Sequence, residues 1–209
     1  MKLLLNILIL GFALFQMGSS CESELNRIVP DPHNYPLHSA VKFNRMEEVR
    51  KLIEQDGISA NSSDNNRNTP MHIAAYQGDI SMIKYLASKG ADLNARDAPK
   101  GRTPLHVAAA QSHWLSGYQD VINTLIELGA DVHAVDNDKK QTALHRAAYW
   151  LKEENVEALI AKGANPHARN SQNRTPCDEI NDRWSAMTDR SRETLRASVS
   201  KIRDLVCTH

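Results

Sequence analysis

The chain has 209 residues, with 25 Lys and Arg residues against 25 Asp and Glu residues, enough for one ordinary domain or a short repeat array. This balanced charge argues against a nucleic-acid-binding protein, because such proteins depend on a basic surface. Aromatic residues make up only 5% of the chain, which favours short helices joined by turns over sheets rich in β-branched and aromatic residues.

Residues 1–20 have the composition of a secretory signal peptide. Lys2 is followed by an apolar run over residues 3–15, interrupted by Asn6, and then by small residues at 18–20. One early cation, an apolar stretch and small residues before a cut are typical of such signals. The run is short for a permanent membrane anchor, which needs about 20 apolar residues, so we expect cleavage after residue 20.

Cys21 follows the predicted cut directly. The stretch MGSSC resembles the lipobox of bacterial lipoproteins, in which the cysteine is acylated and becomes the new N-terminus. Gly18 departs from that motif, which prefers Leu or another bulky apolar residue. Two alternatives therefore stay open for a bacterial envelope: a lipoprotein anchored through Cys21, and a soluble periplasmic protein that begins there. In both, residues 21–34 form a tether.

Cysteine arithmetic bears on the same choice. The three cysteines are Cys21, Cys177 and Cys207, and an odd number leaves one thiol unpaired in an exported protein. If Cys21 carries a lipid, Cys177 and Cys207 remain as a pair in an oxidising compartment. Their disulfide would tie the last helix to the start of its own unit. The alternative is that Cys177 is simply a small buried hydrophobic residue.

A seven-residue pattern recurs along the rest of the chain. Its copies are YPLHSAV at 35–41, TPMHIAA at 69–75, TPLHVAA at 103–109, TALHRAA at 142–148 and a partial TPCDEI at 175–180. A second landmark keeps the same step, as GISAN, GADLN, GADVH and GANPH beginning at Gly57, Gly90, Gly129 and Gly163. Two markers in one register indicate an internal repeat of roughly 33 residues.

The period and the T-P-L-H-x-A signature resemble the ankyrin repeat, a turn followed by two helices. The resemblance implies an all-α ankyrin-repeat solenoid of about five units, with β-hairpin loops and capping end repeats. The repeats would occupy 35–180, as units 35–68, 69–102, 103–141 and 142–174 and the start of a fifth at 175. A C-terminal capping helix would follow within 181–209, because DRSRETLRASVSKIRDLV places apolar residues on one helical face.

The repeated histidines have a structural explanation. His38, His72, His106 and His145 occupy the same place in four successive units, whereas a catalytic base is needed once. The family resemblance implies that this histidine bonds across the loop between neighbouring repeats. The chain also lacks a nucleophile elbow and a glycine-rich phosphate loop, so we expect neither enzymatic activity nor a cofactor.

His133 and His167 replace the Asn that ends GADLN and lie one repeat apart. Stacked units could bring them within reach of one metal ion. They have no Cys or acidic pattern with ligand spacing around them, so we expect no bound metal. A metal-binding or enzymatic envelope protein using His133 and His167 is the alternative function.

The hairpins before units three and four, DAPKGR and DNDKKQ, are each one residue longer than a 33-residue unit allows. In the family, hairpin tips and the inner faces of the first helices line a groove for partner proteins. Carried over by position, the groove residues are Arg67, Asn68, Tyr76, Gln77, Lys100, Arg102, Gln111, Lys139, Lys140, Arg146, Tyr149 and Trp150. This set is basic and partly aromatic, which predicts a protein partner with an acidic or mixed surface; the alternative is that the loops are polar only for solubility.

The third unit is the longest because SHWLSGYQ follows its first helix. We expect this insertion to place Trp114, Leu115 and Tyr118 near the surface, with Trp114 as a further partner contact. The alternative is that Trp114 folds back onto Tyr149 and Trp150.

The sequence thus favours an exported adaptor that binds another protein in the cell envelope. It would serve either as a helper of a resident enzyme or as an immunity protein against an incoming toxin. We expect a monomer that binds no nucleic acid and contacts a membrane only through a lipid on Cys21.

Overall fold

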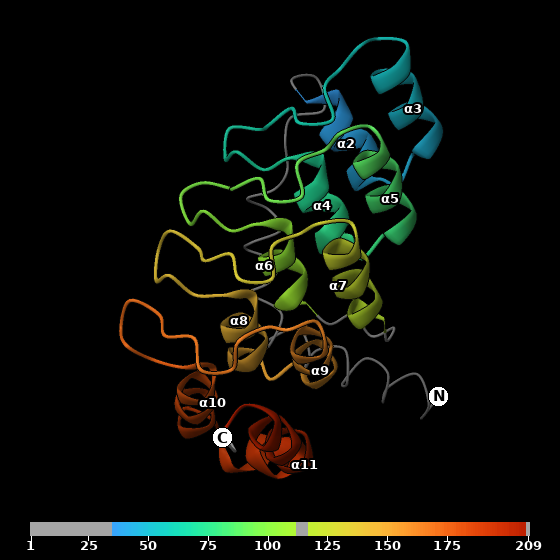
Figure 1. Cartoon of the computed structure of the whole chain (residues 1–209). Coiled ribbons are helices and arrows are strands. Elements are labelled where there is room, and N and C mark those ends of the chain that lie inside the picture. Colours follow the sequence, from blue (N-terminus) through green and yellow to red (C-terminus); the bar gives the residue numbers. More distant parts are fainter. Residues whose placement is uncertain (1–34, 112–116, 208–209) are drawn as a thin grey trace, which may run out of the picture.

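The computed structural model describes residues 35–111 and 117–207, and within them the chain forms ten helices (Figure 1). They are α2 (Pro36–Lys42), α3 (Met46–Glu54), α4 (Pro70–Gln77), α5 (Ile80–Ser88), α6 (Pro104–Ala109), α7 (Tyr118–Glu127), α8 (Ala143–Tyr149), α9 (Glu153–Ala161), α10 (Pro176–Ser185) and α11 (Asp189–Val206). In the described ranges no helix is both long enough and apolar enough to cross a bilayer.

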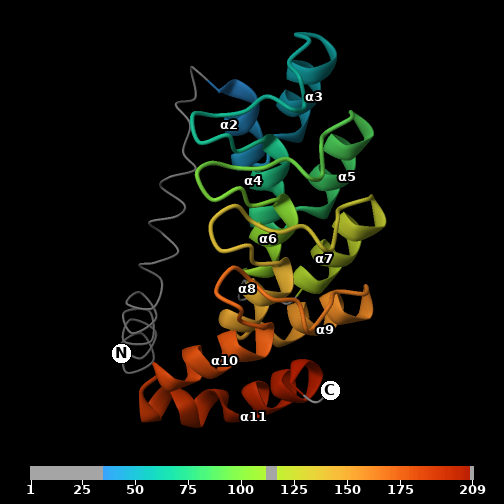
Figure 2. The same cartoon turned by 60° about the vertical axis from the view of Figure 1, so that its left-hand side comes forward.

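The helices stack as five pairs in two rows. One row holds the first helices of the pairs, α2, α4, α6, α8 and α10, and the other row holds the second helices, α3, α5, α7, α9 and α11 (Figures 1 and 2). The connecting loops project on one side of the stack. Each helix packs on its own partner, and most also pack on the equivalent helix of a neighbouring pair; α3 and α5 are joined by a hydrogen bond from Tyr85 to Glu54. The predicted all-α ankyrin solenoid is confirmed.

The loops contain less β-structure than expected. Over the described part of the chain, the only β-pairing is one isolated antiparallel bridge between Val135 and Thr142. Each loop is closed instead by one or two backbone hydrogen bonds, such as the bond from the N–H of Asp136 to the carbonyl oxygen of Gln141 (2.9 Å). Polar side chains, described below, supply the rest of their order.

Each first helix begins where its local sequence requires. Thr69 and Thr103 are N-caps with extended backbone, and the following Pro70 and Pro104 occupy the first helical position, where a missing N–H costs no hydrogen bond. The Ala pairs that follow are fully buried, 0% exposed at Ala108, which lets the two rows of helices approach closely. Thr–Pro therefore sets the start of the helix and Ala sets its packing distance.

Residues in the left-handed region recur at the same places in successive units. At the hairpin tips these are Arg67, Gly101, Lys140 and Asn173, with φ between 55° and 65°. Only Gly101 has a steric reason to be glycine, because an added Cβ would lie 2.2 Å from Cγ of Asn137 in the next hairpin. Elsewhere the tip accepts long polar side chains, which point away from the stack's core.

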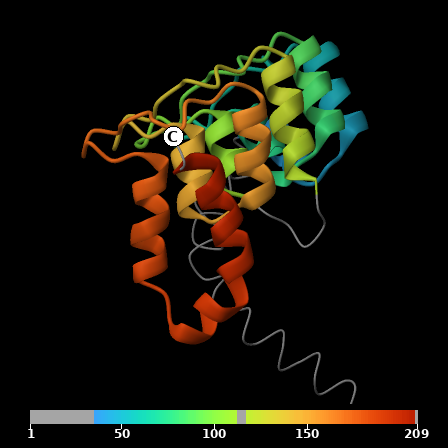
Figure 3. The same ribbon diagram turned by 60° about the horizontal axis from the view of Figure 1, so that its bottom comes forward.

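The fifth unit is a complete helix pair. The expected boundary at residue 181 falls inside α10, because a capping box between Thr175 and Asp178 starts a helix that runs on to Ser185. The expected C-terminal helix is α11, which lies beside α10 and packs on α9 (Figure 3). Arg192 donates to the carbonyl oxygens of Trp184 and Ser185 at 3.1 and 2.9 Å, and so caps the end of α10.

Candidate partner-binding site

Buried histidines join neighbouring units. In the third unit, Thr103 donates its backbone N–H to Nδ1 of His106 (3.3 Å), and Nε2 of His106 lies 2.9 Å from the carbonyl oxygen of Gln141 in the next hairpin. Because Nδ1 accepts, the proton sits on Nε2, which donates to Gln141. The same Nε2-to-carbonyl contacts join His38 to Asn68, His72 to Arg102 and His145 to Arg174.

These histidines are neutral at physiological pH. Burial lowers the pKa of His106 to about 4, since removing an imidazolium from water is unfavourable. Burial likewise lowers the pKa of His38, His72 and His145. A neutral ring with one donor and one acceptor fits both of its contacts, so the scaffold interpretation of the T-P-L-H histidine is confirmed.

One buried acceptor organises each hairpin. Oδ1 of Asp136 accepts the backbone N–H groups of Lys139 (3.0 Å) and Gln141 (3.1 Å), and the carboxylate is only 3% exposed. The equivalent acceptors in the other hairpins are Asp64, Asp97 and Asn170. These residues were not predicted from the sequence, although an Asp or Asn recurs five or six positions before each capping Thr.

The hairpin tips bond to one another along the stack. The backbone N–H groups of Ala98, Asn137 and Ser171 donate to carbonyl oxygens one hairpin back, at Asn66, Lys100 and Lys139, each over 2.7 Å. The two middle hairpins are longer than the outer ones. The N–H groups of Asp97 and Asp136 donate to the carbonyl oxygen five residues later, whereas the N–H of Asp64 donates to the carbonyl oxygen four residues later. The longer hairpins are the ones that carry Lys100 and Lys139.

A cleft of about 220 Å³ lies where these two longer hairpins meet α8 and α10. Its lining residues are Lys100, Asp136, Asp138, Lys139, Gln141, Arg146, Tyr149, Trp150 and Glu179. Five of them belong to the groove set drawn from the sequence: Lys100, Lys139, Arg146, Tyr149 and Trp150. The structure therefore gathers residues from four separate segments around one opening.

One wall of the cleft is aromatic. The rings of Tyr149 and Trp150 meet edge to face, with centroids 5.3 Å apart. The guanidinium of Arg183, from α10, lies 5.4 Å from each ring centroid, a distance at which a cation is attracted by the π-face. Arg183 was absent from the sequence-derived set because the repeat pattern fades before it.

The cleft has mixed charge, which corrects the expected basic character. Glu179 is 4% exposed, and its Oε1 accepts from Nε2 of Gln141 and from Nδ2 of Asn170, both at 3.0 Å. With the carboxylates of Asp136 and Asp138, it balances the three cations of the lining. The set drawn from the sequence included the cations of the hairpins and of the first helices but none of these three acids.

Several expected groove residues serve the scaffold instead. Asn68 and Gln111 are 4% and 8% exposed, too buried to meet a partner. Arg102 forms an ion pair with Asp97 at 2.7 Å, with only 13% of its side chain exposed. A fourth residue, Gln77, donates to the carbonyl oxygen of Lys42.

The remaining members of the set lie outside the cleft lining. Arg67 and Lys140 are exposed at hairpin tips, and Tyr76 is half-buried. Tyr118, expected near the surface, is 5% exposed, and its hydroxyl donates to the carbonyl oxygen of Tyr76. Burial also raises the pKa of Tyr118. Trp114, Leu115 and the lipidation candidate Cys21 lie outside the described residues.

His133 and His167 take the place of two asparagines that clamp the stack. Asn94 receives the N–H of Asp131 on Oδ1 (2.8 Å) and donates from Nδ2 to the carbonyl oxygen of Gly129 (3.4 Å); Asn61 does the same one unit earlier. His133 and His167 are exposed. Across the described ranges, no three His, Cys, Asp or Glu side chains are grouped as metal ligands.

Comparison with known proteins agrees with this architecture. NF-kappa-B inhibitor cactus of Drosophila yakuba is 53% identical over 93 residues, 44% of this chain and 17% of that protein. ARF GTPase-activating protein Git of Drosophila melanogaster is 35% identical over 77 residues, 37% of this chain and 10% of that protein. Alpha-latrocrustotoxin-Lt1a of Latrodectus tredecimguttatus is 35% identical over 77 residues, 37% of this chain and 5% of that protein.

The chain thus spans only a small part of the relatives that it matches. The family model for ankyrin repeats (3 copies) nevertheless matches it over residues 12–97, 37–136 and 98–170. Repeats of this kind are protein-interaction modules, with a surface built from several stacked units. The model match, the repeated Thr-capped helix pairs and the histidine contacts between units together show that the chain belongs to the ankyrin repeat family.

Proposed function

We propose that the chain is an exported, non-enzymatic adaptor that binds a partner protein of a bacterial cell envelope through the cleft beside α8. The observation that carries the proposal is the convergence of Lys100, Lys139 and Arg146 with an aromatic wall around one opening. Aromatic and arginine side chains in a concave site are the residues that most often dominate binding energy at protein interfaces.

The composition of the cleft favours a partner with both charged and apolar groups at its contact surface. Lys139 and Asp138 are exposed side by side at the rim, where charges chiefly affect association rate and salt dependence. Trp150 and Tyr149 lie deeper and offer the apolar contact. We therefore expect a mixed partner surface rather than a uniformly acidic one.

An envelope location is supported from two directions. Residues 1–20 combine Lys2, an apolar run and small residues, as secretory signals do. The described region contains a Cys177–Cys207 disulfide, and disulfides persist mainly in oxidising compartments such as the bacterial periplasm. Mass spectrometry of the mature N-terminus tests both export and acylation of Cys21: a diacylglyceryl adduct marks a lipoprotein, and an unmodified Cys21 a soluble protein.

Two roles fit such an adaptor, a helper of a resident envelope enzyme and an immunity protein that blocks an incoming toxin. The matched relatives differ in role: by name one is an inhibitor of NF-kappa-B and another an ARF GTPase-activating protein. Gene neighbourhood separates the two, because an immunity protein is encoded beside its toxin.

Affinity capture from envelope extracts tests the cleft. The test variant combines Lys139→Glu with Tyr149→Ala, and the matched control is Lys51→Glu, an exposed lysine on α3 far from the cleft. We expect one protein to be captured by the wild type and the control and lost by the test variant. Capture of the same proteins by all three would refute the cleft as the binding site.

A further inference from the structure

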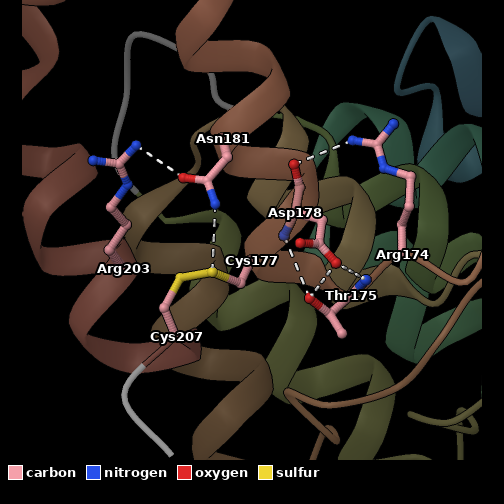
Figure 4. The surroundings of a disulfide bond; sticks show 7 residues. All are labelled: Arg174, Thr175, Cys177, Asp178, Asn181, Arg203 and Cys207. Atoms are coloured by element: carbon pink, nitrogen blue, oxygen red, sulfur yellow. Dashed lines mark hydrogen bonds between the residues drawn. A yellow bond between two sulfur atoms is a disulfide. The ribbon is translucent and has the colours of Figure 1, made fainter.

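The last helix pair is closed into a ring by the disulfide. Cys177 is the second residue of α10, and Cys207 directly follows the last residue of α11, 30 positions later. The bond joins the start of one helix to the end of the other (Figure 4). Those two helix ends are therefore held together whatever happens at the turn between them.

Other contacts hold the middle of α11 independently of the disulfide. Val199 and Ile202 are 1% and 0% exposed against the stack. Nζ of Lys201 pairs with Glu153 at 2.6 Å and with Glu157 at 2.8 Å, both on α9. Breaking the sulfur–sulfur bond should therefore free the end of α11 and the start of α10 without detaching the helix pair.

The start of α10 is also part of the cleft. Glu179 comes two residues after Cys177 and holds Gln141 of the neighbouring hairpin at 3.0 Å. One turn further along, Arg183 covers the rings of Tyr149 and Trp150. A change in the position of α10 is thus transmitted directly to the polar floor and the aromatic wall.

The environment of the two sulfurs favours thiol exchange. Cys207 is half-buried at the free end of α11, where an attacking thiolate can reach it. Cys177 lies at a helix N-terminus, which stabilises a departing thiolate, and Nδ2 of Asn181 lies 3.8 Å from its sulfur. Asn181 is itself held by Nη2 of Arg203 at 2.9 Å. The first-turn carboxylate of Asp178 opposes this effect, but it accepts the N–H of Thr175 at 2.8 Å.

We propose that Cys177–Cys207 is a thiol-exchangeable lock that sets how firmly α10 is held in the wall of the cleft. A dithiol reductant attacks Sγ of Cys207 as a thiolate, forms a mixed disulfide and expels Cys177 as a thiolate, which takes up a proton. The second thiol of the reductant then releases Cys207 as a thiol and closes the reductant's own disulfide. Two electrons pass to the protein, and its partner binding weakens; this consequence rests on the proposed function.

Hydrogen exchange tests the lock without any partner. All samples carry Cys21→Ser, so that only the two cysteines of the lock can react, and are compared oxidised and after treatment with dithiothreitol. We expect amide exchange at residues 177–179 and 203–207 to rise on the order of 100-fold on reduction, with exchange in α4 and α6 unchanged. Equal exchange at those residues in the two forms, or a bond that resists dithiothreitol in the folded protein, would overturn the proposal.

The Cys177→Ser, Cys207→Ser double variant is the matched control. It should show the raised exchange at all times and should not respond to dithiothreitol. A response of the double variant would mean that the reductant acts elsewhere, and the lock would be rejected.

The second test uses the protein captured through the cleft. Reduction of the wild type should weaken its binding several-fold, and the double variant should bind as weakly as the reduced wild type. If the oxidised protein captures nothing through the cleft, the proposed function fails while the exchange result stands. If oxidised and reduced proteins bind equally well, the coupling fails while the proposed function stands.

Discussion

The third and fifth units begin alike and are stabilised differently. In the third, His106 accepts from its own Thr103 and donates to the next hairpin at Gln141. In the fifth, Asp178 occupies the equivalent position and accepts from Thr175, but the described chain has no further hairpin for it to reach. The disulfide between α10 and α11 takes over there.

An inner unit is therefore fixed by its neighbour, and the end unit by a bond to itself. In a repeat stack each unit contacts only the adjacent ones, so stability is a sum of unit and interface terms. Damage to an inner histidine weakens an interface shared by two units. Damage to the disulfide stays at one end.

The sharpest test of this contrast compares His106→Ala with Asp178→Ala. The first removes a cap, a link between units and a buried ring, and should lower the free energy of unfolding by about 4 kcal/mol. The second removes only a helix cap, at a cost of about 1 kcal/mol. Urea unfolding measures the free energy of unfolding of both variants. Equal decreases would contradict the view that His106 links two units whereas Asp178 only caps its own helix.

Removing the disulfide should have the next largest effect. Cys177→Ser with Cys207→Ser opens a 30-residue loop, which costs about 3.6 kcal/mol in the chain-entropy description. Because the loss is confined to the last helix pair, we expect a separate early step in thermal unfolding followed by circular dichroism. A single transition shifted as a whole would contradict the local character of the end unit.

Acid should disturb the inner units before the end unit. An unfolded histidine has a pKa of about 6.5, whereas burial lowers that of His106 to about 4. Between these values the unfolded chain binds a proton that the folded chain does not. Stability therefore falls as pH drops from 7 to 5, by about 2 kcal/mol from His106 alone.

Asp178 behaves differently under acid. Hydrogen bonds from Thr175 lower its pKa, so its contribution is lost only as pH falls below about 4, where the unfolded carboxyl protonates. Urea unfolding at pH 7, 6 and 5 measures the histidine effect. His106→Gln should reduce the fall in the free energy of unfolding between pH 7 and pH 5, and Asp178→Asn should leave that fall unchanged. A fall reduced by Asp178→Asn and not by His106→Gln would show that the pH response does not come from the inner units.

The smallest expected difference concerns the position held by Asn94 in one unit and by His133 in the next. Asn94→Ala removes two contacts with the next unit and should cost about 1 kcal/mol. His133 occupies the same position one unit later, and its exposed side chain predicts a change within about 0.5 kcal/mol for His133→Ala. Chemical denaturation of the two variants side by side measures the difference, and a larger loss for His133→Ala would reveal a role for that side chain.

Most helices were predictable because their signals are local. Thr103 and Pro104 mark a start, and Gly129 comes two positions after the last residue of α7. The predicted boundary at residue 181 came too early in the fifth unit because TPCDEI no longer matches the repeat. Asp178 nevertheless accepts the N–H of Thr175, as the histidine does in the other units. Capping needs an acceptor at that position rather than a particular residue type.

The site was only partly predictable, because it depends on contacts between segments. Lys139 and Tyr149 could be assigned by position within a repeat, since the repeat fixes which face they occupy. Glu179 and Arg183 could not, because their place in the cleft follows from how α10 packs on α8. Tyr118 was assigned to the surface because the sequence does not show that its ring packs over Gly78.

Helices α2 to α5 of units one and two supply no residue to the lining of the cleft, which takes only the hairpin residue Lys100 from these two units, yet these helices stand between the cleft and residue 35. Each unit adds a helix layer of about 10 Å, so together they hold the cleft roughly 20 Å from the point where the first helix begins. The number of units thus sets the distance between the cleft and the N-terminal end of the stack. Duplicating or deleting the first unit, residues 35–68, would change the distance between the binding surface and the N-terminal end of the stack without altering any residue that lines the cleft.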